Sequence, residues 1–212
     1  MRKELERKLG RSFARLATDA VVRWPRLWRP FRPLMRAQFD RLAPSWDTMR
    51  DPAHLSSFER ALASVDGAPG RALDLGTGTG AAAFSIARHF PETQVTGADL
   101  AEEMLAEARR KTPPELANRV RFQQADSARL PYDDSSFELV TLANMIPFFD
   151  ELARVVVPGG WALFSFSVGP ETPIWVAPER LRDELSRRGF SDFADFQVGP
   201  GTALLARKQE PV

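Results

Sequence analysis

The sequence contains no cysteine and only two histidines, His54 and His89, among its 212 residues. Without cysteine the chain can form neither a disulfide nor a thiolate-ligated metal site. Two histidines are also too few for a histidine-rich metal centre. We therefore predict that the protein holds no metal ion.

Long hydrophobic runs are missing as well. No apolar stretch approaches the ~20 residues that a membrane-spanning helix needs, and the N-terminus lacks the continuous apolar segment of a signal peptide. The apolar content of 43% is ordinary for a globular protein, and 212 residues are enough for one α/β domain with some chain left over. These features predict a cytoplasmic protein.

The net charge of +1 conceals an uneven distribution along the chain. Residues 1–41 hold twelve Lys/Arg and four Asp/Glu, a surplus of +8, so residues 42–212 carry −7. We therefore divide the chain into a basic arm, residues 1–41, and an acidic body, residues 42–212.

The arm has two halves with different patterns. In the first half, apolar residues recur every three or four positions between basic ones, which predicts an amphipathic helix that ends near residue 22. These apolar residues are Leu5, Leu9, Phe13, Leu16 and Ala20. In the second half, Trp and Phe alternate with Arg, and prolines at positions 25, 30 and 33 predict a kinked segment without a long helix.

Three interpretations of the arm stay open. It could be a helical cover packed on the body, or residues 1–36 could bind an anionic membrane surface, since Trp and Phe suit the headgroup boundary and Arg is attracted to anionic lipids. In the second case the protein would be peripheral on the inner membrane face. Nucleic-acid contact is the least favoured, because no nucleic-acid module is recognisable.

The most informative stretch is residues 71–81, RALDLGTGTGA. A short apolar run ends in alternating glycines at 76, 78 and 80, and a helical pattern follows, which is typical of a nucleotide cradle. The fingerprint G-x-G-x-x-G/A of a dinucleotide site is satisfied by Gly76, Gly78 and Ala81. However, Asp74 would repel a pyrophosphate and instead suits a ligand with a cationic end.

The rest of the body predicts an α/β fold, a Rossmann-like three-layer sandwich. Its mostly parallel seven-stranded sheet ends in an antiparallel hairpin, and the arm adds helical structure at the N-terminus. The expected strands are residues 72–75, 94–99, 120–127, 137–142, 161–167, 192–198 and 202–207. Helical patterns include 56–65 and 178–188. Asp99 and Asp126 would both stand at carboxyl ends of parallel strands, where such sheets bind ligands.

Four further motifs occur in order. They are AQFDRLAPSWD at 37–47, GADLAEEML at 97–105, RLPYDDSSF at 129–137 and ELARVVVPGG at 151–160. With the glycine loop they resemble the class I S-adenosylmethionine (SAM)-dependent methyltransferases, in particular the ubiquinone/menaquinone-biosynthesis branch. The resemblance covers residues 37–207, and its third motif is absent from ordinary NAD domains.

The resemblance implies SAM as the cofactor and assigns roles to matching residues. Asp74 would lie near the cationic methionine end, Asp99 would accept hydrogen bonds from the ribose, and Asp126 would bind the adenine amino group. The full set implied is Asp74, Gly76, Thr77, Gly78, Gly80, Asp99, Leu100, Met104, Asp126, Ser127 and Asn144.

The resemblance also implies a substrate pocket that is apolar and aromatic. Its expected walls are Trp46, Met145, Ile146, Phe148, Phe149 and Trp175, although such residues also fill cores. The implied acceptor is a small apolar or membrane-borne molecule: a quinone, an isoprenoid, an aromatic metabolite or a lipid. His54 is the candidate general base by residue type and position, with a surface or capping role as the alternative.

Two other functions stay open at this point. The chain could be a non-catalytic, SAM-binding regulatory domain, because no strong base stands out. It could also be an NAD(P)-dependent oxidoreductase, although it lacks a Tyr-x-x-x-Lys pair. The acceptor atom and the oligomeric state are left open by these motifs.

Overall fold

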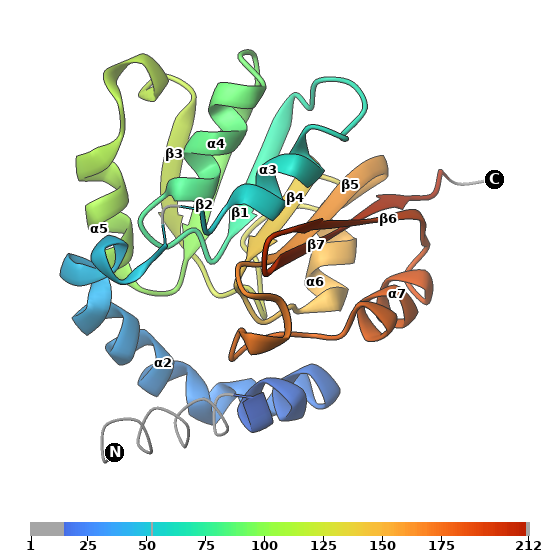
Figure 1. Cartoon of the computed structure of the whole chain (residues 1–212), viewed down its shortest axis with the longest axis horizontal. Helices are drawn as coiled ribbons and strands as arrows, with labels where there is room; N and C mark the ends of the chain where they lie inside the picture. The colour runs from blue at the N-terminus through green and yellow to red at the C-terminus, as the bar shows by residue number, and fades with distance from the viewer. Residues whose placement is uncertain (1–14, 52, 211–212) are drawn as a thin grey trace.

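The computed structural model describes residues 15–51 and 53–210, which form one seven-stranded sheet with helices on both faces (Figure 1). The strand order is β3-β2-β1-β4-β5-β7-β6. Strands β1 to β5 are parallel, and β7 is antiparallel to both β5 and β6. The strands are β1 (Arg71–Leu75), β2 (Gln94–Asp99), β3 (Val120–Gln124), β4 (Phe137–Ala143), β5 (Val156–Phe166), β6 (Phe190–Val198) and β7 (Gly201–Lys208).

Helices connect the strands and precede the sheet. The α-helices are α2 (Trp28–Leu42), α3 (Ser56–Leu62), α4 (Ala81–His89), α5 (Glu102–Lys111), α6 (Phe149–Val155) and α7 (Pro178–Ser186). The short 3-10 helices are η1 (Pro25–Leu27), η2 (Ala43–Ser45), η3 (Asp47–Met49), η4 (Pro114–Leu116) and η5 (Gly169–Glu171). Residues 15–23 are also helical.

Two hydrophobic cores lie on opposite faces of the sheet. Leu73 and Val140 pack on one face with residues of α6 and α7. Ala72 and Leu139, on the other face, pack with residues of α3 and α4. Successive strand residues point to opposite faces, so each central strand contributes to both cores. The predicted three-layer sandwich with a C-terminal antiparallel pair is confirmed.

Strand β5 begins five residues earlier than the predicted Trp161. Val156 already pairs with Phe137, and the register shifts between Phe137 and Leu139. Gly159, with φ of 74°, supplies the left-handed conformation that this irregularity needs. The motif at 151–160 therefore runs straight from α6 into the strand.

The first helix ends at Arg23 and the helical conformation breaks before η1, close to the predicted end near residue 22. The prediction of no long helix after this break is wrong, because α2 is a continuous helix of 15 residues. Pro25 opens η1, and Pro30 is the third residue of α2. The first backbone N–H groups of a helix have no partner within it, so proline costs little there. Only Pro33 lies inside the helix, where it removes one backbone hydrogen bond.

The buried face of the preceding helix also differs from the predicted one. Thr18, Val21 and Val22 are buried, whereas Leu16 is 69% exposed. Val22 joins the core that contains α6 and α7. The predicted positions Leu5, Leu9 and Phe13 lie outside the described residues.

Helix α2 crosses the lower end of the molecule in Figure 1, between α5 and the helix of residues 15–23. The side chain of Asp40 accepts a hydrogen bond from the backbone N–H of Glu103 on α5, at 3.1 Å. α5 follows β2, so this contact places α2 at the carboxyl ends of the parallel strands. The second half of the arm therefore packs beside the expected cofactor site.

Candidate cofactor site

The glycine loop after β1 is held in a shape that other residues rarely adopt. Gly76, Gly78 and Gly80 have φ of 66°, 54° and 89°, in the left-handed region that favours glycine. The N–H groups of Gly76 and Thr77 donate to the carbonyl of Ala98 at 2.8 and 3.1 Å. The loop is thus fastened to the end of β2.

Asp99 joins this loop to the start of α5. Its Oδ2 accepts from the N–H of Gly78 at 2.8 Å, and its Oδ1 accepts from the N–H of Ala101 at 2.9 Å. Burial raises the pKa of Asp99, and these two hydrogen bonds oppose the rise. The predicted ribose ligand is therefore held in a fixed position at the end of β2.

Asp74, at the end of β1, is 1% exposed. Its Oδ1 accepts from the Thr141 hydroxyl at 2.8 Å, while no hydrogen bond of normal geometry reaches Oδ2. Burial raises the pKa of Asp74 from 3.8 to about 6, and the hydroxyls of Thr77 and Thr141 oppose the rise. A cationic group beside Oδ2 would supply the missing partner, as the predicted role at the methionine end requires.

Three buried side-chain atoms lack a hydrogen bond of normal geometry among the described residues: Trp46 Nε1, Asp74 Oδ2 and Thr77 Oγ1. The Thr77 hydroxyl nevertheless lies close enough to Asp74 to lower the pKa of that carboxyl. All three belong to the predicted site. Trp46 Nε1 would lie 3.4 Å from a Cβ placed on Gly78, so the indole covers the glycine loop. Buried polar atoms are normally satisfied, so these three indicate a polar ligand. Trp46 offers an N–H donor, Thr77 a hydroxyl and Asp74 a carboxylate. These groups suit the amino-acid and ribose parts of SAM.

The predicted adenine end opens into a cavity of about 620 Å³, within the usual range for small-molecule sites. Residues from the strand ends face residues of α2 across it. The lining residues are Leu100, Gln124, Ala125 and Asp126 on one side, and Arg32, Pro33, Arg36, Ala37 and Asp40 on the other. Ala37 and Asp40 belong to the motif at 37–47, whereas Arg32, Pro33 and Arg36 were missed by the sequence analysis.

Three other predicted cofactor residues do not line this cavity: Met104, Ser127 and Asn144. Met104 is buried against Ala43 and Ala101. Ser127 Oγ is buried 4.0 Å from the sulfur of Met145. The Asn144 side-chain oxygen accepts from the backbone N–H of Ser167 at 2.9 Å and from its hydroxyl at 3.1 Å. These hydrogen bonds tie the end of β4 to the end of β5.

The predicted substrate walls divide into two groups. Met145 lies on the glycine loop, because its side chain would meet a Cβ on Gly76 at 2.8 Å. Phe148 packs edge-on against Trp28 of α2, with ring centres 5.4 Å apart. Trp46, Met145 and Phe148 therefore border the glycine loop or α2.

The second group lies in or against the core. Ile146 and Trp175 are partly buried and pack on the core cluster beneath α6 and α7. Phe149 is buried in that cluster, 6.2 Å from the Phe164 ring. Phe149 was predicted as a pocket wall, but its position at the start of α6 turns it toward the sheet. We assign it to the core.

Arg50 is another residue that the sequence analysis missed, and its guanidinium lies 4.7 Å from the centre of the Trp46 ring. Burial lowers the pKa of Arg50, and the charges of Asp47, Asp74 and Asp99 oppose this. Arg50 thus places a positive charge beside the site's carboxylates. No motif singled it out.

His54 lies next to Arg50. Its Nδ1 is 2.7 Å from the carbonyl of Asp51, and its Nε2 is 3.4 Å from Arg50 Nη1. Burial, followed by the charge of Arg50, lowers the pKa of His54. The imidazole is therefore neutral near pH 7, with Nε2 turned toward the arginine.

Comparison with known proteins agrees with this geometry. A family model described as a methyltransferase domain matches residues 72–160. The demethylmenaquinone methyltransferase of Thermus thermophilus is 39% identical over 134 residues, which cover 58% of this chain and 60% of the relative. That of Chlorobaculum parvum is 33% identical over 162 residues, covering 68% and 64%. The chain thus spans less than two thirds of these relatives' length.

The chain belongs to the class I SAM-dependent methyltransferases. A solved SAM-dependent methyltransferase of Aquifex aeolicus shares the fold, with a TM-score of 0.65 at 19% identity, over 78% of this chain and 97% of that one. SAM is the cofactor of this family, and the unpartnered atoms around the glycine loop fit it.

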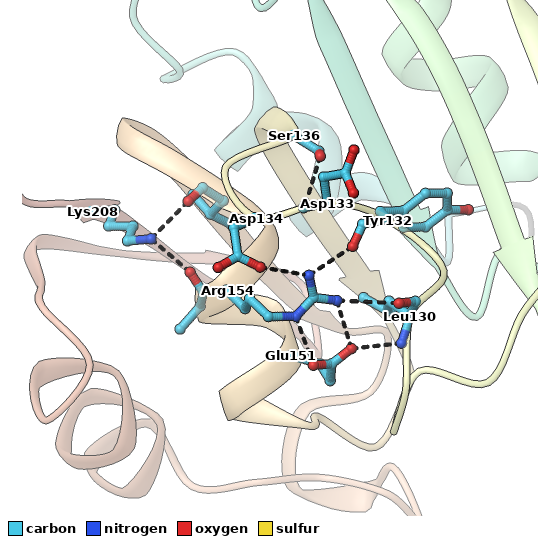
Figure 2. Close-up of polar contacts among 10 residues, drawn as sticks. Leu130, Tyr132, Asp133, Asp134, Ser136, Glu151, Arg154 and Lys208 are labelled. Atoms are coloured by element: carbon cyan, nitrogen blue, oxygen red, sulfur yellow. Dashed lines mark hydrogen bonds and ion pairs between the residues drawn. The ribbon is translucent and has the colours of Figure 1, made fainter.

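The structure explains why two methyltransferase motifs occur together here. Figure 2 shows Arg154 at the centre of the contacts that join residues 129–137 to α6. Its guanidinium donates to the carbonyls of Leu130 and Tyr132 at 3.1 and 2.6 Å, and to the carboxylates of Glu151 and Asp134. Hydrogen bonds to these carboxylates raise the pKa of Arg154. We call this arrangement the Arg154 clamp.

The clamp holds in place two segments that border the predicted cofactor site. Glu151 Oε2 also accepts from the N–H of Leu130 at 2.6 Å, so the two motifs are bonded in both directions. The clamped loop follows Asp126, and α6 follows Met145 and Phe148. The clamp therefore fixes the segments that carry Asp126, the predicted adenine ligand, and the residues beside α2.

Proposed function

We propose that this chain transfers the methyl group of SAM to a small apolar acceptor of the quinone class. Residues 42–212 form the catalytic domain in this proposal, and residues 1–41 form the arm that covers it. The observation that carries it is the set of unpartnered buried atoms at the glycine loop, together with Asp99 and Asp126 at the neighbouring strand ends.

The acceptor class is supported by two further observations. Trp46 and Met145 cover the glycine loop, so apolar side chains flank the place where a methyl group would be offered. The curated relatives reported above are named demethylmenaquinone methyltransferases. A flat aromatic ring would fit beside these side chains, and it would exclude water from the site.

Bound SAM supplies an activated methyl group, so the protein's task is to orient the acceptor and exclude water. Asp74 would hold the cationic end of the cofactor, and Asp99 the ribose. A hydroxyl or ring-carbon acceptor must also lose a proton. We assign this step to His54, which is neutral near pH 7; Arg50 must first withdraw from Nε2.

We further propose that the protein is cytoplasmic and works at an anionic membrane surface. Among the described residues, no helix combines the length and apolar character needed to cross a bilayer. However, Leu34 and Trp24 are 60% and 48% exposed, and Leu27 is also exposed. Exposed arginines at 23, 26 and 29 lie among them in the sequence. This composition suits the headgroup layer, where a quinone substrate would be met.

The first test is calorimetric titration of the full chain with S-adenosylhomocysteine. We expect micromolar binding that Asp99→Ala weakens by about 1–3 kcal/mol, the value of hydrogen bonds to a charged group. Glu103→Ala, which removes an exposed acid on α5, should leave the affinity unchanged. Equal loss in both variants, or binding of NADH in place of S-adenosylhomocysteine, would overturn the proposal.

A methyl-transfer assay distinguishes an enzyme from a non-catalytic, SAM-binding regulatory domain. Methyl transfer from SAM to a demethylated quinol should be seen with the wild type and lost with Asp99→Ala. Tight binding of the cofactor without methylation of any quinol, isoprenoid or phenolic acceptor would favour the regulatory alternative.

A further inference from the structure

Both carboxylate oxygens of Asp126 are engaged by side chains of α2. Trp28 Nε1 donates to Oδ1 at 2.8 Å, and the Arg32 guanidinium forms an ion pair with Oδ2 at 3.0 Å. The backbone N–H of Ala128 adds a second hydrogen bond to Oδ1, at 3.0 Å. A carboxylate has about four acceptor positions, so three are already in use.

Arg32 controls access to the remaining acceptor position of the Asp126 carboxylate. Arg32 and Asp126 both line the cavity between α2 and the strand ends. An amino group that approaches Asp126 from this cavity therefore meets the guanidinium already bonded to Oδ2. It must take the place of Arg32 or share the oxygen with it.

The N-terminal half of α2 is held loosely. None of the helix's 15 residues is buried, and Pro33 removes a hydrogen bond from its interior. Arg32 itself is 51% exposed, and exposed ion pairs contribute little to stability. Besides the Asp126 contacts, residues 28–36 are held by packing of Trp28 on Phe148. The C-terminal half is anchored by Asp40 at α5 and by Phe39 and Leu42, which pack on the cluster of Ala43, Ala101 and Met104. The N-terminal half can therefore leave its site at small cost.

We infer that α2 is a lid latched onto Asp126, and that the lid competes with the adenine amino group for this carboxylate. The inference rests on the proposed cofactor site, since it takes Asp126 as the adenine ligand. In the closed form Trp28 and Arg32 satisfy the acid. When the cofactor binds, the latch opens and residues 28–36 of α2 move away from the strand ends.

The test compares latch variants with a matched control in the full chain. Arg32→Gln removes the ion pair, and Trp28→Phe removes the N–H donor while keeping a ring against Phe148. Each should lower the Kd for S-adenosylhomocysteine about two- to fivefold, the worth of an exposed ion pair or neutral hydrogen bond. Arg29→Gln removes an exposed arginine of the same helix that does not line the cavity, so its Kd should equal that of the wild type.

Hydrogen exchange gives a second readout that does not depend on the variants. Saturating S-adenosylhomocysteine should increase amide exchange in residues 28–36 of the wild type if the latch opens. A decrease there, or weaker binding by Arg32→Gln, would show that α2 is a fixed wall and would overturn the lid. Such results leave the proposed function intact. Absence of binding in the wild type and in both latch variants would overturn both proposals, whereas binding by Arg32→Gln alone would support the latch.

Discussion

At the scale of single residues, Asp74 has the most unfavourable surroundings among the site's acids. It is buried, one of its oxygens lacks a partner, and the nearby charge of Asp99 adds to the effect of burial. A carboxyl group in these surroundings lowers the free energy of unfolding of the ligand-free protein. Its position is understandable if a cationic ligand completes it, because function often retains groups that stability alone disfavours.

Asp74→Asn is therefore expected to stabilise the free protein at neutral pH while weakening cofactor binding. The native carboxyl has a pKa of about 6, and the ordinary value is 3.8. Between these values the native state binds more protons than the unfolded state, so the wild type loses stability as the pH rises. An amide does not titrate, so the variant escapes this loss. Near pH 7.5 the gain should reach about 1–3 kcal/mol.

Urea unfolding at about pH 5 and at about pH 7.5 provides the measurement. The stability difference between Asp74→Asn and the wild type should widen by about 1 kcal/mol toward the higher pH. Other titrating groups act equally on both proteins and cancel. A difference that is constant with pH would show that Asp74 is ionised in the native protein at both values.

At the scale of elements, the Arg154 clamp is the contact that joins residues 129–137 to α6. The side chain is partly buried and donates to two backbone carbonyls as well as two carboxylates. Arg154→Ala leaves these acceptors without partners, so we expect a loss of about 1–3 kcal/mol in the free energy of unfolding. Arg154→Lys keeps the charge but not the planar fork and should lose about half as much. Urea denaturation measures both.

Arg187→Ala is the control for the clamp. Arg187 is an exposed arginine on a helix end that pairs with Glu184, and its removal should change stability by less than about 0.5 kcal/mol. If Arg154→Ala costs no more than this control, the clamp is not what holds the two motifs together.

Elements with strong local signals were predictable from the sequence, and contacts between distant elements were not. β2 was predicted as Gln94–Asp99, as observed, because its apolar residues are bounded by turns. α2 was missed because three prolines outweighed its helical pattern. Pro25 and Pro30 lie in first turns, where they cost little, and the helix tolerates Pro33 in its interior. Asp74, Asp99 and Asp126 lie at the ends of predicted strands or just after them and could be found. Trp28 and Arg32 stand 98 and 94 residues from Asp126, and no local pattern joins them.

At the scale of the whole molecule, the separation of charge gives the arm a surface unlike that of the body. The arm carries +8 and the body −7, and exposed Trp24, Leu27 and Leu34 add apolar area. The full chain should therefore bind vesicles that contain anionic lipid and not neutral ones. Because each basic residue near such a surface contributes about 1 kcal/mol, Arg26→Gln with Arg29→Gln should weaken binding by about 2 kcal/mol, roughly thirtyfold.

Vesicle co-sedimentation at low and at high salt tests this expectation. Wild-type binding should fall as salt rises, because the Debye length shortens. Arg60→Gln with Arg88→Gln removes the same charge from exposed positions on α3 and α4, away from the arm. This control should bind like the wild type if the arm is the contact surface. Equal weakening in both double variants would mean that net charge alone drives binding, and absence of binding at low salt would remove the membrane from the proposal.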